Sequence, residues 1–155
     1  ILGMIYIGWF FSYLIFIRSL TVHGGYLFFL MFTIWANDVV AYLAGRFFGR
    51  HKLAPQISPN KTWEGAIAGF ITCVLAAEIF SGIAMINGTH AIILGALIGI
   101  VAQFSDLVES LIKRDAGVKD SSNILPGHGG ILDRMDSFIL TAPLMYYYVV
   151  WFILK

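Results

Sequence analysis

Charge is what this sequence has least of. Charged side chains make up 12% of the 155 residues, roughly half the share that is typical of soluble globular domains. So few charges could not cover a water-soluble surface, and an apolar content of 59% excludes a disordered chain. The bilayer is therefore the expected solvent, and the length predicts one domain.

Cysteine is also nearly absent. The single Cys73 excludes an internal disulfide, and we expect it to be an apolar filler within a helix. The net charge of +1 gives no sign of a nucleic-acid partner, and we expect none. The chain opens inside an apolar run, so we expect it to be the C-terminal part of a longer protein.

Five apolar segments predict an all-α, polytopic transmembrane bundle of about five spanning helices. A spanning helix needs about 20 largely apolar residues. The segments cover residues 1–17, 25–45, 63–86, 91–112 and 137–154. We expect residues 1–155 to form a single transmembrane catalytic domain.

The basic residues are distributed unevenly between the connections. Eight of the ten Lys and Arg residues lie in two long loops, near 46–62 and 113–136. Both loops fall on the same side if all five segments span. The positive-inside rule predicts that this side is cytoplasmic.

Carboxylates interrupt the apolar segments at similar depths. Asp38 and Asp106 lie about 20 Å and 22 Å from the outer ends of their helices, in the cytoplasmic third of a core about 30 Å thick. Asp133 and Asp136 are one turn apart at the entry of the last helix. We therefore expect four Asp residues in one layer, whereas Glu78 falls in the outer half and suggests a structural role.

A polar stripe follows the fourth helix, with Asp106, Glu109, Ser110 and Lys113 at positions i, i+3, i+4 and i+7. It could be a solvated helix end. Clustered carboxylates also suit Mg²⁺, and adjacent Lys and Arg residues suit phosphate oxygens. Together they are the parts of a phosphoryl-type transfer site. A cation transporter built around Asp38 and Asp106 is an alternative.

Residues 110–137, SLIKRDAGVKDSSNILPGHGGILDRMDS, resemble the signature of the phosphatidate cytidylyltransferases, or CDP-diacylglycerol synthases. The matching positions are Ser110, Lys113, Arg114, Lys119, Asp120, Pro126, His128, Gly129, Gly130, Asp133, Arg134 and Asp136. SPNKTWEG at 58–65 and DVVAYLAGR at 38–46 resemble two further motifs of that family. Ser105 stands where the family commonly has Gly, and could re-aim Asp106.

The resemblance implies a specific reaction. CTP condenses with phosphatidic acid to give CDP-diacylglycerol and pyrophosphate, with Mg²⁺ and no organic cofactor; a second metal ion and a homodimer are left open. It also implies an integral protein of the bacterial inner membrane whose active site faces the cytoplasm. A related CTP-dependent lipid kinase is an alternative function.

The resemblance, with the polar clusters above, assigns roles to residues. We expect Asp106, Asp133 and Asp136 to bind the metal, with Asp38 a weaker candidate; ion pairing with Lys113 or Arg134 is the alternative. Lys113, His128 and these three Asp residues form the expected catalytic set. The expected substrate-binding residues are Ser58, Lys61, Thr62, Ser110, Lys113, Arg114, Lys119, Asp120, Gly129, Gly130 and Arg134.

The segment before the third helix carries a prediction of its own. Thr62 could cap that helix, with Trp63 and Glu64 in the first turn. A helix N-terminus favours an anion, so Lys61 and nearby backbone N–H groups could hold CTP phosphates. An ordinary capped helix beside a loop lysine is the alternative.

Overall fold

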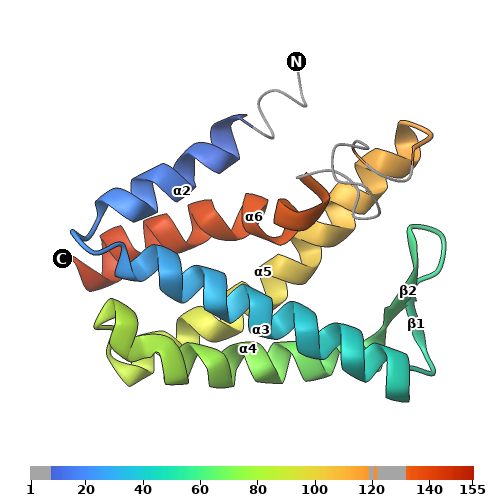
Figure 1. Cartoon of the computed structure of the whole chain (residues 1–155), viewed down its shortest axis with the longest axis horizontal. Helices are drawn as coiled ribbons and strands as arrows, with labels where there is room; N and C mark the ends of the chain where they lie inside the picture. The colour runs from blue at the N-terminus through green and yellow to red at the C-terminus, as the bar shows by residue number, and fades with distance from the viewer. Residues whose placement is uncertain (1–7, 119–120, 122–131) are drawn as a thin grey trace.

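The computed structural model describes residues 8–118, 121 and 132–155, which form a helical bundle with one small hairpin (Figure 1). The helices are α2 (Phe10–Ser19), α3 (Gly25–Phe48), α4 (Trp63–Ala84), α5 (Gly88–Asp115) and α6 (Leu132–Tyr148), followed by a π-helical segment, η2 (Val149–Ile153). Antiparallel strands β1 (Lys52–Ala54) and β2 (Ser58–Thr62) connect α3 to α4. The predicted helical membrane class is confirmed, because α3, α4, α5 and Met135–Ile153 are long and apolar enough to span a bilayer.

The described part of the first apolar segment forms α2, of 10 residues, and residues 1–7 of that segment lie outside the described residues. Four helices of the described part are of spanning length, and α2 is a shorter apolar helix beside them. The loop at 46–62 contains the hairpin, whose strands pair Lys52 with Thr62 and Ala54 with Ser58. Strands this short, KLA in β1 and SPNKT in β2, carry almost no hydrophobic alternation, so their pairing left no pattern in the sequence.

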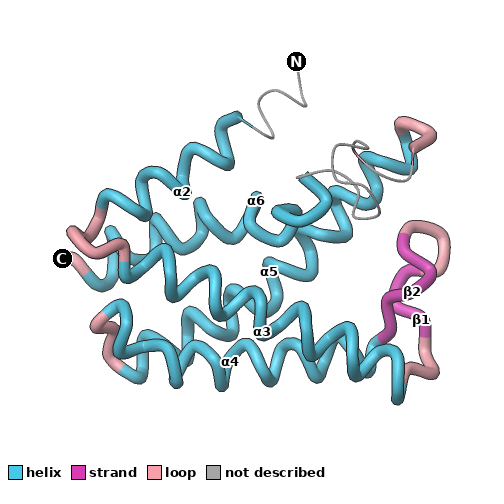
Figure 2. The backbone as a smooth tube through the Cα atoms, in the orientation of Figure 1, coloured by secondary structure: helices cyan, strands magenta, loops and turns pink. Residues whose placement is uncertain are grey.

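The helices alternate in direction and therefore sort their connections to two ends. Figure 1 shows the hairpin, the ends of α3 and α5 and the starts of α4 and α6 at one end of the bundle. The turns that join α2 to α3 and α4 to α5 lie at the other end (Figure 2). The prediction that the residues flanking the two basic loops share one end is confirmed, and the compartment that this end faces stays a prediction.

Small residues bring α3 and α4 into close contact. A Cβ atom added to Gly65 would lie 2.6 Å from the Ala41 carbonyl oxygen, and one added to Gly69 would lie 2.8 Å from Asn37 Oδ1. Helices in membranes associate through such close backbone approaches, because lipid provides little hydrophobic drive between them. This contact holds the middle of α3, including Asp38, at a fixed height beside α4.

Apolar side chains cover the outward face of α4. Ile67, Ile71, Leu75 and Ile79 recur every four residues and are all exposed. Residues four apart lie on the same helix face, so they form one apolar stripe. A bilayer would cover this stripe, whereas the polar groups gather inside the bundle near the hairpin.

Candidate active site

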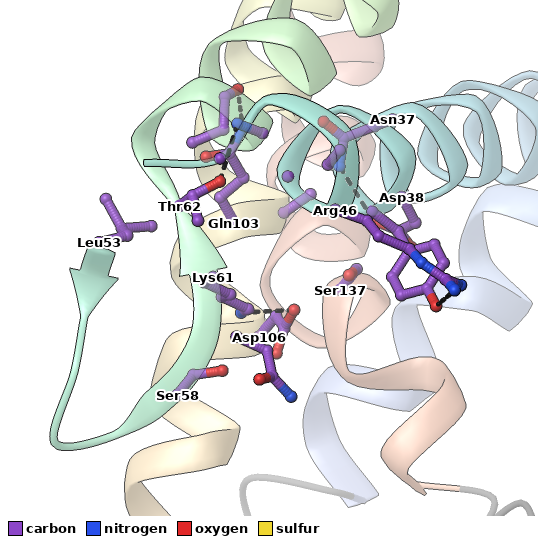
Figure 3. A pocket seen from close by; sticks show the side chains of 18 of the residues that line it. Asn37, Asp38, Arg46, Leu53, Ser58, Lys61, Thr62, Gln103, Asp106 and Ser137 are labelled. Atoms are coloured by element: carbon purple, nitrogen blue, oxygen red, sulfur yellow. Dashed lines mark hydrogen bonds and ion pairs between the residues drawn. The ribbon is translucent and has the colours of Figure 1, made fainter. Parts of the chain in front are cut away.

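A cavity of about 770 Å³ opens among α3, the hairpin, α4, α5 and α6 (Figure 3). Four carboxylates, from Asp38, Asp106, Asp133 and Asp136, line it together with Lys61 of β2. The sequence predicted that the helices would bring these four Asp residues to one layer, and the structure places all four around one space.

Lys61 and Asp106 face each other across this cavity from β2 and α5 (Figure 3). Their Nζ and Oδ2 atoms lie 2.5 Å apart, and each side chain keeps about a quarter of its surface exposed, 25% for Lys61 and 30% for Asp106. The sequence analysis gave Lys61 to phosphate and Asp106 to a metal ion, and did not foresee their pairing. The cavity therefore presents a positive and a negative side chain in direct contact with each other.

A second ion-pair cluster connects α5 to α6. Lys113 Nζ lies 2.5 Å from Glu109 Oε2 and 2.8 Å from Asp133 Oδ1. Asp133 Oδ2 also accepts hydrogen bonds from the backbone N–H and the hydroxyl of Ser121, both at 3.0 Å. The alternative of ion pairing with Lys113 is thus what this structure shows for Asp133.

Asp136 is held through its backbone as well as its carboxylate. Its Oδ1 accepts a hydrogen bond of 2.7 Å from the Ser137 N–H, and its carbonyl oxygen accepts one from the Ser105 hydroxyl. Ser105 Oγ in turn accepts from the Leu140 N–H at 3.3 Å. The buried Ser105 side chain therefore contacts α6, and its expected effect on the orientation of Asp106 stays a prediction.

Asp38 receives its nearest support from its own helix. The buried Asn37 side chain donates a hydrogen bond of 2.9 Å to Asp38 Oδ1. The charges of Asp106 and Lys61 also act on Asp38, and the charge of Asp106 acts on Asp136. Asp106 is therefore electrostatically linked to both Asp38 and Asp136 around the cavity.

Thr62 caps α4 as the sequence predicted. Its Oγ1 accepts a hydrogen bond of 3.2 Å from the Gly65 N–H, and Trp63 and Glu64 form the first turn. Ser58, Lys61 and Thr62 all line the cavity. The hairpin and the helix start therefore present one continuous polar wall to it.

Other predicted residues lie beside the cavity. Ser110 Oγ contacts Asp106 Oδ1 at 3.4 Å, so it reaches the site through that carboxylate. Arg114 donates to the Ile57 carbonyl at 3.3 Å, which ties the end of α5 to the hairpin. Glu78 is exposed on α4 and is not among the lining residues, in agreement with its expected separate role.

Part of the predicted set falls outside what the structure describes. Lys119, Asp120, His128, Gly129 and Gly130 lie outside the described residues, as does the Arg134 side chain. Their predicted roles stay predictions.

The structure adds lining residues that the sequence analysis did not assign to the site: Tyr42, Arg46, Lys52, Asn60 and Gln103. Gln103 Nε2 donates to the Ala66 carbonyl at 2.8 Å and so ties α5 to α4. Gln103 lies three residues before Asp106 and so shares the helix face of the polar stripe, and this spacing could have indicated from the sequence that Gln103 belongs to the site. Tyr42 and Arg46 belong to the motif at 38–46 and Asn60 to the motif at 58–65, whereas Lys52 was visible only as part of a basic loop.

Two lysines offset part of the negative charge of the site, because Lys61 pairs with Asp106 and Lys113 pairs with Asp133. Among the described residues, no three His, Cys, Asp or Glu side chains converge closely enough to enclose a metal ion. The donor chemistry nevertheless fits a hard cation, because Asp106 and Asp133 offer carboxylate oxygens and each already contacts an ammonium group.

A helical membrane bundle with carboxylates and lysines around one cavity is the class that the fold and site define. Residues 1–152 match the model of the cytidylyltransferase family, and the chain belongs to that family. A Bacillus subtilis (strain 168) protein named phosphatidate cytidylyltransferase is 44% identical over 154 residues, which cover 97% of this chain and 57% of that protein.

Two further relatives bear the same name. One from Haemophilus influenzae (strain ATCC 51907 / DSM 11121 / KW20 / Rd) is 45% identical over 133 residues, 81% of this chain and 46% of that protein. One from Rickettsia bellii (strain RML369-C) is 39% identical over 155 residues, 95% of this chain and 67% of that protein. The chain thus spans about half to two thirds of the length of these relatives.

Proposed function

We propose that the protein containing this chain transfers CMP from CTP to phosphatidic acid, giving CDP-diacylglycerol and pyrophosphate. The observation that carries the proposal is the cavity in which Asp106, Asp133 and Asp136 lie with Lys61. Such a site combines oxygen ligands for a cation with a positive group for phosphate. The names of the relatives supply the cytidine and lipid specificity that this geometry alone leaves open.

In the proposed reaction a phosphate oxygen of the lipid attacks the α-phosphorus of CTP. The new oxygen–phosphorus bond forms as the bond to the β-phosphate oxygen breaks, and pyrophosphate leaves with that electron pair. A lipid phosphate monoester is largely dianionic near neutral pH, with a second pKa of about 6, so little proton removal is needed. Catalysis then depends mainly on positioning and charge neutralisation.

Different residues of this chain would position the substrate and neutralise its charge. Lys61, beside the capped start of α4, would hold CTP phosphates, since cations and helix N-termini both favour anions. Asp106, Asp133 and Asp136 would hold Mg²⁺, with Asp38 as a weaker candidate. When bound, Mg²⁺ would neutralise charge developing on the phosphates.

The proposal extends to location. An active site at the hairpin end would face the cytoplasm of a bacterial inner membrane, because the residues flanking both basic loops lie at that end. A lipid could then bring its phosphate to the carboxylates while its acyl chains stay in hydrocarbon. A homodimer and a second metal ion belong to the same proposal.

Two positions of radiolabel in CTP test the function. The full-length protein in lipid nanodiscs receives phosphatidic acid and CTP labelled at the α-phosphorus or, in a parallel sample, at the γ-phosphorus. Label from the α-position in the lipid product supports CMP transfer. A further sample contains diacylglycerol, whose hydroxyl can accept a phosphoryl group; label from the γ-position in its lipid product would instead identify the CTP-dependent kinase. Cation flux into proteoliposomes without CTP would identify the transporter.

A further inference from the structure

Glu109 is a buried carboxylate that the proposed reaction leaves without a role. Its side chain on α5 is 2% exposed, and it does not line the cavity. Its charge is met by Lys113, whose Nζ lies 2.5 Å from Glu109 Oε2. Burying a charge is costly, so a side chain in this position calls for an explanation.

Lys113 connects Glu109 to the cavity. The same ammonium group lies 2.8 Å from Asp133 Oδ1, and Asp133 lines the cavity whereas Lys113 does not. The order from the interior outward is therefore Glu109, Lys113, Asp133 and the cavity. Two carboxylates share one ammonium, so these three groups carry a net charge of −1 when all are ionised.

The sharing of the Lys113 ammonium by two carboxylates affects how strongly Asp133 can attract another cation. Without Glu109, the full positive charge of Lys113 would act on Asp133 and weaken its attraction for a second cation. Because Glu109 also holds the ammonium group, its negative charge offsets part of the positive charge that Lys113 presents to Asp133, so Lys113 opposes a cation at Asp133 less than it would alone. Glu109 further gives Lys113 a partner when Asp133 turns to another cation, so that the ammonium stays buried and paired.

We propose that Glu109 is a positioning residue: it shares the Lys113 ammonium with Asp133, and so keeps the Asp133 carboxylate able to accept a divalent cation. The inference rests on the proposed function, because it gives Asp133 a metal to bind. A purely stabilising role explains the geometry less well. Buried ion pairs are weak sources of stability compared with apolar side chains of similar volume.

Divalent-cation binding, measured without CTP or lipid, tests this role. Mn²⁺ stands in for Mg²⁺, and electron paramagnetic resonance counts free Mn²⁺ during titration of the full-length protein in detergent. Glu109→Gln keeps the size of the side chain and removes its charge. Its Mn²⁺ affinity should fall roughly tenfold or more, the scale seen when partners of metal ligands are removed.

Glu78→Gln is the matched control, since it makes the same chemical change at an exposed position outside the cavity. It should bind Mn²⁺ as the wild type does. Thermal unfolding identifies the folded variants. If Glu109→Gln does not fold, Glu109→Asp decides the question: it keeps the charge but withdraws it from Lys113 by one methylene, and its Mn²⁺ affinity should still fall several-fold.

The outcomes separate this inference from the proposed function. Folded Glu109→Gln, or Glu109→Asp in its place, with wild-type Mn²⁺ affinity would overturn the role of Glu109 whatever the enzyme makes. A wild type that binds no Mn²⁺ would overturn it as well. Failure to form CDP-diacylglycerol would refute the proposed reaction alone, because Mn²⁺ binding is measured without turnover.

Discussion

Lys61 on β2 and Asp106 on α5 form an ion pair of 2.5 Å between two segments that lie far apart in the sequence. The pair places the positive group expected for CTP phosphates directly beside a carboxylate expected for the metal. Substrate and metal would each replace one partner of this contact, so their binding should be coupled.

Replacing Lys61 tests its phosphate role. Lys61→Ala should raise the KM for CTP roughly tenfold, because a charge-assisted contact of about 1.5 kcal/mol is lost. The melting temperature should change little, since a partly exposed ion pair contributes about 0–1 kcal/mol. Steady-state kinetics and thermal unfolding measure the two effects, and Lys155→Ala at the opposite end is the control. A phosphate-free cytidine competitor should inhibit wild type and Lys61→Ala equally; a selective change would point to base recognition instead.

Neutralising the carboxylates should be far more damaging. Asp106→Asn, Asp133→Asn and Asp136→Asn should each lower turnover roughly a hundredfold or more, because charge stabilisation in the transition state is lost. The exposed Glu78→Gln should retain near-normal turnover. CMP transfer from α-labelled CTP measures both. Near-wild-type turnover in folded Asp133→Asn would contradict the assignment of Asp133 as a metal ligand.

Chelation tests the metal directly. Excess EDTA should abolish CMP transfer, and added Mg²⁺ should restore it, because the phosphates then lack a neutralising cation. The same radiolabel assay measures loss and recovery. Full turnover in EDTA would contradict the proposed carboxylate–metal site, whatever the Asp variants show.

The close contact of α3 and α4 predicts that alanine substitutions at two glycines of α4 change the free energy of unfolding by different amounts. Gly65→Ala should lower the free energy of unfolding by about 1–3 kcal/mol, because its Cβ would meet the Ala41 carbonyl oxygen at 2.6 Å. Gly82→Ala in the same helix has open space and should be neutral or slightly stabilising. Thermal or denaturant unfolding in detergent compares them. Equal stability of the two variants would contradict the packing described.

Orientation can be tested with single cysteines in a Cys73→Ala background. Lys52→Cys in the hairpin and Ala116→Cys after α5 should resist an impermeant thiol reagent in intact cells and react after lysis. His23→Cys, in the turn at the opposite end, should react in intact cells. The reverse labelling pattern would invert the proposed topology.

The sequence by itself determined the features that depend on local composition. Apolar runs of about 20 residues specify spanning helices wherever they occur, and Thr62 before Trp63 and Glu64 marks a helix start through its own hydroxyl. Alternating spans also force the residues flanking both basic loops to one end. The signature over 110–137 indicated the family before any contact was known.

Only the tertiary structure decided which side chains meet. The ion pair of Lys61 with Asp106 depends on a hairpin of low hydrophobic pattern and on the rotation of α5, and no local signal sets either. The polar stripe was visible in the sequence, yet a solvated helix end was an alternative interpretation. The packing of α5 against α6 decides that Lys113 contacts both Glu109 on its own helix and Asp133 on α6. It also decides that Asp106, rather than Glu109, lines the cavity. Periodicity reports which residues share a helix face, whereas the partner of that face is fixed by the fit between helices.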